Sequence, residues 1–304
     1  MSQDPGTWRA SFDVAISRGL AGGHAEAHGL SASGEVIDIA PHRHAVELNL
    51  TRFELGLSRS FNETWDAGIR VPYFIKEQTA GVVFPNGGTA ADRAAALRNG
   101  RIHHRTETYE GFGDPELTVG WRKRDLFGEG SVFRFGFGFT LPLGDTEEDP
   151  WVLGDAGHEH LHVQFGNGTF DPVFDIYLGK PINDKLGWSV FGKARLPLYH
   201  NDRGYRGPPE LTLAPRLTYL VNKDLSLSVG VVAQYFGYSD WELTGRDRNS
   251  GLFTTNASVG IGYKVTDSVT ASLTALIPVY TESFGSEDAL DTAPTFSLSI
   301  GYSF

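Results

Sequence analysis

Histidine is the residue type of this chain that is best placed to do chemistry. Of its ten histidines, three stand at alternate positions in the stretch GHEHLH: His158, His160 and His162. On an extended segment these side chains share one face, where imidazoles can ligate Zn²⁺, Cu²⁺ or Ni²⁺, and Asp155 and Glu159 would add carboxylates. Such a run fixes neither the ligand geometry nor the hydrogen bonds that orient metal-bound imidazoles. We therefore expect these histidines to be solvated loop residues and the protein to use no cofactor. A divalent metal bound by the loop is the alternative.

Composition excludes several classes of protein. There are 26 Lys and Arg against 37 Asp and Glu, a net charge of −11, and no basic cluster, which argues against a nucleic-acid partner. The absence of cysteine excludes disulfide scaffolds and thiolate metal sites. No apolar run approaches the roughly 18 residues of a membrane-spanning helix. The chain is polar on average, yet it contains 37 Gly and 20 Phe, a combination that suits β-strands with two very different faces.

Long segments with one apolar and one polar face supply those strands. In segment 131–143, four phenylalanines alternate with arginine and glycine. Segments of this length with a period of two are the signature of transmembrane β-barrels. The predicted strands are 7–18, 44–58, 65–76, 108–123, 130–143, 169–180, 187–199, 208–221, 224–238, 251–265, 267–280 and 292–304.

The connections between these segments support a barrel independently. Short connections alternate with mostly long ones, which are 19–43, 77–107, 144–168, 200–207, 239–250 and 281–291. Outer-membrane barrels have short periplasmic turns and longer outer loops. We therefore predict a single domain over residues 1–304, an all-β, transmembrane, antiparallel up-and-down barrel of about 12 strands. The chain ends on Phe304, which fits the terminal aromatic signal read by the barrel assembly machinery.

Three local features add detail to this prediction. In segment 44–58 the apolar parity changes, which predicts a β-bulge near Thr51 and Arg52. Segment 88–99 predicts a short loop helix with Thr89 as its N-cap, lying across the outer mouth or in the lumen. The opening residues lack the basic start and apolar stretch of a signal peptide. We expect a mature protein of the bacterial outer membrane whose signal peptide has been removed, with outer-membrane lipid as its surroundings.

Three stretches give the chain a family resemblance. The stretch ELNLTRFELGLSRSFNETWDAGIRVPYF resembles the early strands of the DUF3187 family of proteobacterial outer-membrane proteins. GFGDPELTVGWR and FRFGFGFTLPLGD are similar to a GxGD strand and a PxG strand end of that family, and the same features recur in the phenol-degradation meta-pathway barrels. The resemblance implies an outer-membrane location and passage of small hydrophobic molecules. It supplies no catalytic motif.

Charged residues of the polar parity are predicted to face the lumen. The candidate constriction residues are Arg70, Glu116, Arg122, Arg134, Asp175, Lys193, Arg195, Glu210 and Arg216. The remaining lumen charges are Arg9, Asp13, Glu47, Glu54, Lys76 and Asp171. In one interpretation these charges pair across the lumen and brace the barrel, because isolated charges in a confined space are costly. In the other, opposed basic and acidic walls orient a polar or zwitterionic solute.

Taken together, these patterns predict a passive channel or uptake protein for small molecules, hydrophobic or aromatic ones among them. The alternative is a non-conducting surface barrel whose His-rich, acidic outer loops bind a partner or a divalent metal. An enzyme is not expected. His44 is placed near the outer leaflet, where an outer-membrane lipid hydrolase would hold its base. No serine on a neighbouring strand can be matched to it, and no G-x-S-x-G elbow occurs.

Overall fold

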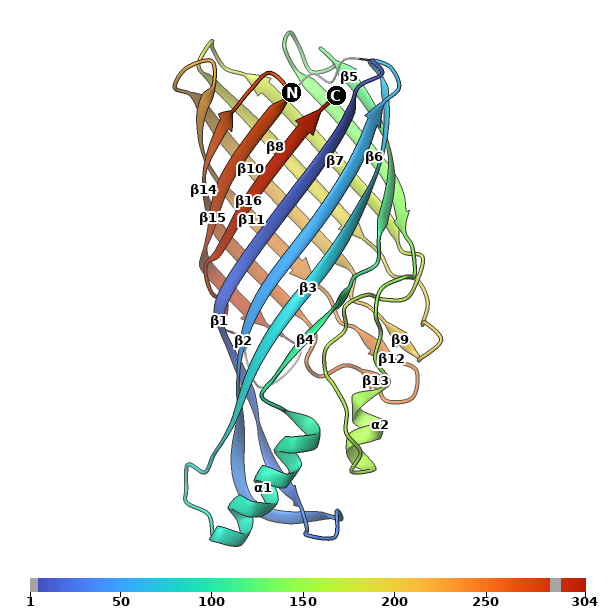
Figure 1. The fold of residues 1–304 in the computed structure, drawn as a ribbon, viewed down its shortest axis with the longest axis vertical. Helices are drawn as coiled ribbons and strands as arrows, with labels where there is room; N and C mark the ends of the chain where they lie inside the picture. The colour runs from blue at the N-terminus through green and yellow to red at the C-terminus, as the bar shows by residue number, and fades with distance from the viewer. Residues whose placement is uncertain (1–4, 285–290) are drawn as a thin grey trace.

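The computed structural model describes residues 5–284 and 291–304, and the chain forms a closed antiparallel barrel there (Figure 1). Residues 285–290, part of the predicted loop 281–291, lie outside the described residues. The barrel is built from β1 Trp8–Leu30, β2 Val36–Ser60, β3 Trp65–Val83, β4 Glu107–Phe112, β5 Glu116–Arg124, β6 Val132–Thr140, β7 Pro172–Pro181, β8 Leu186–Arg195, β10 Glu210–Leu220, β11 Leu225–Phe236, β14 Leu252–Lys264, β15 Val269–Ser283 and β16 Thr295–Ser303.

Neighbouring strands in the chain are neighbours in the barrel, and the first strand pairs with the last. β4 and β5 both pair with β3, so they are the two halves of one interrupted strand. The thirteen described segments therefore make twelve barrel strands. Closure runs from Arg9 opposite Ser303 to Ser17 opposite Thr295, which joins the first and last strands of the barrel wall. The predicted fold class is confirmed.

The outer surface of the barrel wall is apolar. Val119, Phe137, Leu213, Ile261 and Leu273 share the outward parity of their strands, and each is about half exposed. A surface of this kind would be an aggregation hazard in water, but it matches the apolar band that faces lipid in outer-membrane barrels.

Aromatic residues encircle one end of this surface, where short turns join the strands and both termini lie (Figure 1). This girdle consists of Trp8, Trp65, Trp121, Trp188, Tyr219, Tyr263 and Tyr302. Register pairing gives all of them the outward parity. Tryptophan and tyrosine are enriched at membrane–water interfaces because one end of the ring is apolar and the other polar. The girdle therefore marks one edge of the lipid-facing band.

The first hairpin is longer than the sequence predicts. Residues 19–43 were expected to be an outer loop, but β1 and β2 continue beyond the start of β16 and pair as far as Leu30 opposite Val36. This two-stranded extension projects from the end of the barrel opposite the termini (Figure 1). Its backbone ladder does not depend on an apolar face, because it lies past the lipid band. Alternating hydrophobicity therefore could not reveal it.

The predicted bulge in β2 is wrong. The β2–β3 register is continuous from Arg43 to Ser60, and the shift nearest to the predicted bulge lies in β1, between Ser17 and Leu20. Continuous alternation places Glu47 on the face opposite Glu54, so the prediction that Glu47 faces the lumen is also wrong. The same alternation gives Val46, Leu48 and Leu50 the parity of Glu54. Beyond the lipid band, apolar side chains are no longer required to face outward.

Two helices and a small sheet lie at the same end of the barrel as the extension. α1 spans Ala90–His103, and Thr89 caps it through a capping box with Asp92. This helix contacts the extension of β1 and β2, and also β3, instead of crossing the mouth or entering the lumen (Figure 1). α2 spans Pro150–Asp155, and β9 Tyr205–Arg206, β12 Asp240–Trp241 and β13 Gly245–Arg246 form a three-stranded sheet. Neither described helix has the length and apolarity that would let it cross a membrane.

Candidate functional site

A network of ion pairs lines one side of the lumen. Arg134 of β6 donates from Nη2 to Asp66 Oδ1 of β3 at 2.7 Å, and from Nη1 to Asp175 of β7. Arg122 of β5 donates from Nη2 to Asp66 Oδ2 at 3.0 Å. All four side chains are largely shielded from solvent. Because Asp66 and Arg134 belong to strands separated by β5, their pair ties together non-adjacent strands.

Three more ion pairs extend this network toward β10. Lys193 of β8 pairs with Glu116 of β5, across the two intervening strands β6 and β7. Arg70 Nη1 lies 3.9 Å from Glu116 Oε1, and Arg195 of β8 pairs with Glu210 of β10. We call these nine residues the charge network: Asp66, Arg70, Glu116, Arg122, Arg134, Asp175, Lys193, Arg195 and Glu210.

Glycines on the lumen face make room for these side chains. A Cβ on Gly120 would lie 2.3 Å from Arg134 Nη2, and one on Gly136 would lie 2.0 Å from Asp175 Oδ2. Both distances are far below any normal contact, so a larger residue at either position would displace the pair. The alternation of phenylalanine and glycine in β6 therefore has two causes. Lipid requires the phenylalanines, and the paired side chains of Asp175 and Arg134 require the space at Gly136.

Eight of the nine predicted constriction residues lie in the charge network, which favours the bracing interpretation. The exception is Arg216 of β10, an exposed side chain for which the described residues contain no ion-pair partner. Sequence reasoning missed Asp66, although it shares the lumen parity of Arg70. Asp66 is also the second residue of the predicted strand 65–76, so parity alone could have identified it.

The opposite side of the lumen carries small side chains. Arg216 of β10 is opposite Gly230 of β11, and residues that are opposite each other in a sheet face the same side. Position 230 therefore faces the lumen, and the pairings of β11, β14 and β15 extend this assignment to the strands that follow. Most lumen-facing positions near the middle of these strands are small: Ser228, Gly230, Ser258, Gly260, Ser272, Thr274, Ser297 and Ser299. Larger residues of the same parity, Val232, Gln234, Asn256 and Leu276, lie closer to the outer end. Long charged side chains thus project from one wall toward a wall of hydroxyl groups and glycines.

At the outer mouth, a segment of the chain folds back against the lumen side of the barrel. Lys76, on the lumen face of β3, donates to the carbonyl of Gln164 at 2.8 Å, and its Nζ lies 4.7 Å from the Phe165 ring centre. Asp114 Oδ2 accepts from the backbone N–H groups of Asn167 at 2.6 Å and Gly168 at 3.1 Å. We call residues 164–171 the mouth segment. Part of the predicted outer loop 144–168 therefore lies against the lumen face of β3 at the outer end of the barrel.

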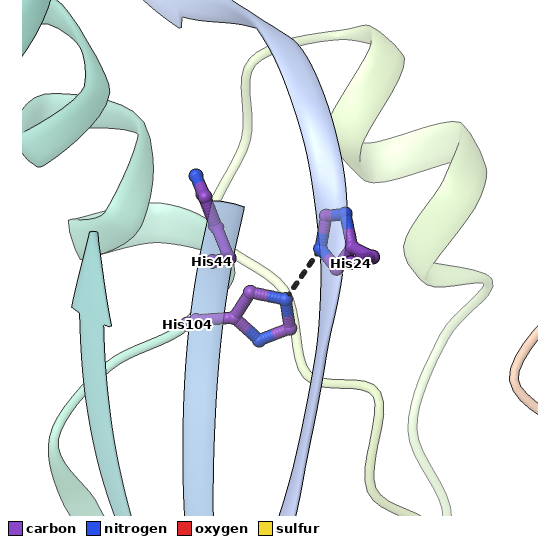
Figure 2. A group of neighbouring side chains, drawn as sticks. All are labelled: His24, His44 and His104. Carbon is purple, nitrogen blue, oxygen red and sulfur yellow. Dashed lines mark hydrogen bonds between the residues drawn. The ribbon is translucent and has the colours of Figure 1, made fainter. Parts of the chain in front are cut away.

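Six histidines gather beside this mouth, in a group that the sequence did not predict. His24 of β1 and His44 of β2 are opposite each other in the register, and His104 is the C-cap of α1. His42 bonds to His44, His162 packs on His104 with ring centres 5.5 Å apart, and His160 packs on His162. We call these residues the histidine cluster. Figure 2 shows its central trio, His24, His44 and His104.

The histidine cluster differs from the metal site expected at His158, His160 and His162. Two of the three expected residues join the cluster, whereas the carbonyl of His158 accepts a bond from His160 Nδ1 at 2.8 Å. Burial, followed by the neighbouring histidines, lowers the pKa of His44 to about 4, and the same causes lower the pKa of His104. Both imidazoles are therefore neutral at pH 7. The trio was missed because its members come from segments far apart in the sequence.

The family described as putative MetA-pathway of phenol degradation matches residues 46–292 of this chain. The chain belongs to that family. Of the two families that the sequence resembles, the match is to the phenol-degradation family. A comparison with curated proteins finds no match.

Among solved structures, the chain is similar to the COG4313 outer membrane channel from Pseudomonas putida F1. That likeness has a TM-score of 0.62 at 12% identity and covers 99% of this chain and 97% of that one. The toluene transporter TodX of P. putida matches at a TM-score of 0.43 and 10% identity, covering 99% of this chain and 90% of that one, which is too weak to carry an argument. The first likeness shows that this member of the phenol-degradation family has the fold of an outer-membrane channel.

Proposed function

We propose that the protein is a passive outer-membrane channel for small molecules. The observation that carries this proposal is the asymmetric lumen, with the charge network on one wall and small hydroxyl residues and glycines on the other. Eight-stranded barrels are just wide enough for side chains to fill, and barrels widen with strand number. In twelve strands, a wall of serine and glycine leaves space that the charged wall does not fill.

The lining also suggests what kind of solute the channel accepts. Paired charges keep the wall hydrated, and opposed donors and acceptors orient a polar molecule during passage. Arg216, outside the charge network, is left to attract an anionic group. We propose small aromatic compounds with a hydroxyl or carboxylate group, because the family description concerns phenol degradation and both walls of the lumen carry hydrogen-bonding groups.

Flux into proteoliposomes tests this proposal and the solute class together. We expect swelling in iso-osmotic glycine, and faster entry of 4-hydroxybenzoate than of an equally sized aromatic cation. Arg216→Gln should reduce this preference for the anion. Arg203→Gln, at an exposed arginine of the outer end, is the matched control and should leave the preference unchanged.

The alternative function, a non-conducting surface barrel, predicts a different result. Folded protein in liposomes would then give no flux of any solute above empty vesicles. Flux of glycine without an anion preference would retain the channel and refute the proposed solute class.

A further inference from the structure

Three imidazoles from three separate segments of the chain converge beside the outer mouth. The ring centres of His24 and His44 are 5.2 Å apart, those of His24 and His104 5.0 Å, and those of His44 and His104 5.4 Å. One nitrogen of each ring lies within 4.8 Å of the others. Figure 2 shows the three rings around a common centre, with His24 and His104 joined by a hydrogen bond. The three rings therefore form a nearly equilateral triangle.

We propose that His24, His44 and His104 bind a divalent transition-metal ion of the Zn²⁺ class. Two imidazole nitrogens on one tetrahedral Zn²⁺ lie about 3.3 Å apart, given Zn–N bonds of about 2.0–2.1 Å. Nε2 of His24 and Nε2 of His104 are already 2.8 Å apart. Side-chain shifts of about an ångström would therefore complete a three-histidine site, as found in zinc proteins that keep a fourth position open.

Hydrogen bonds behind the rings orient two of the ligands. His24 Nδ1 lies 3.2 Å from the carbonyl oxygen of Ala25, and a carbonyl only accepts, so Nδ1 carries the proton. The lone pair of neutral His24 is then on Nε2, the nitrogen that faces His104. Metal-binding histidines are commonly oriented in this way, by donating the other ring N–H to a carbonyl.

His44 is oriented through His42. His42 Nδ1 donates to the carbonyl of Ala40 at 3.2 Å, which leaves His42 Nε2 as an acceptor. His42 Nε2 lies 3.0 Å from His44 Nε2, so His44 donates from Nε2 and its lone pair is on Nδ1. We therefore assign His42 as a positioning residue that acts through His44. The metal-binding nitrogens assigned in this way are Nε2 of His24 and Nδ1 of His44.

The surroundings suit an ion that enters from outside. His44 is 1% exposed, whereas His24 and His104 are only partly covered, so the site has a buried floor and an accessible rim. His162 packs on His104 and can supply the fourth ligand in place of water. A bound ion would join β1 and β2 of the extension to the end of α1, a cross-link that neither the lipid band nor the charge network provides.

Zinc titration of the detergent-solubilised protein, stripped with chelator and free of any polyhistidine tag, tests the site. We expect one Zn²⁺ per chain with a micromolar or tighter Kd. His44→Ala and His104→Ala should abolish this binding. His42→Ala should weaken it by about 10- to 100-fold, as the loss of a group that orients a metal ligand typically does. Bound Co²⁺ should give visible ligand-field bands that the trio variants lack.

His200→Ala is the matched control, because His200 bonds to Asp240 away from the trio. His158→Ala tests the metal site expected from the sequence. Both variants should bind zinc as the unaltered protein does, and the gel mobility of the folded barrel checks that each variant folds. Absence of zinc binding in the folded, unaltered protein would overturn the proposal. Equal affinity in folded His44→Ala or His104→Ala would also overturn it. Neither result bears on channel activity.

Discussion

Asp66 is the residue whose loss should most weaken the lumen wall. It accepts hydrogen bonds from Arg122 and Arg134. The exposed fraction of the side chain is only 9% for Asp66, 13% for Arg122 and 22% for Arg134. Asp66→Asn keeps one acceptor oxygen but removes the charge that both guanidinium groups face. A hydrogen bond to a charged group contributes about 1.5–3 kcal/mol, and breaking a buried pair costs more than breaking an exposed one. Lumen water lowers the cost, so we expect a loss of about 2–3 kcal/mol in the free energy of unfolding.

Equilibrium unfolding in denaturant, followed by tryptophan fluorescence of the barrel in lipid vesicles, measures this loss. Asp267→Asn is the control, because Asp267 pairs with Lys264 in a turn and its side chain is 97% exposed. Exposed pairs of this kind contribute little to stability, so the control should unfold like the unaltered protein. If Asp66→Asn were no less stable than Asp267→Asn, the charge network would not brace the barrel.

Three further predictions concern the lipid face, the mouth and the helix. Val229→Arg should destabilise the barrel by about 2–4 kcal/mol in the same unfolding assay if it lies near the bilayer midplane, whereas Ser228→Arg, toward the lumen, should cost far less. Equal costs would contradict the assignment of the two faces. Asp114→Asn should loosen the mouth segment and raise single-channel conductance; unchanged conductance would show that this segment does not limit flow. Thr89→Ala should lower the local stability of α1 by about 0.5–2 kcal/mol, measured by amide hydrogen exchange, and unchanged exchange would refute the role of the cap.

The barrel could be predicted because its physical requirements are local in sequence. In β6, lipid on one side and water on the other require a change of polarity at every residue, so the phenylalanine ladder identifies the strand without knowledge of its neighbours. The same rule fails where the membrane ends. Val46, Leu48 and Leu50 keep the alternation but face the other way, because no lipid constrains them. The extension of β1 and β2 was hidden for the same reason.

The candidate sites depend on contacts between distant segments, and local sequence patterns do not reveal such contacts. Lumen parity predicted that Glu116 and Lys193 face inward, but their pairing requires the curvature that brings β5 and β8 together across two strands. The histidine cluster requires the extension and the end of α1 to meet. Only the run from His158 to His162 was visible as a local pattern, and it contains two residues of the histidine cluster but none of its central trio.

Single-channel current across a planar bilayer tests the central claim most directly. Purified, folded protein should insert and give stepwise current at constant voltage, with a reversal potential in a salt gradient that shifts when Arg216 is replaced by Gln. A barrel that inserts and folds but carries no current would contradict the channel proposal and favour a surface role.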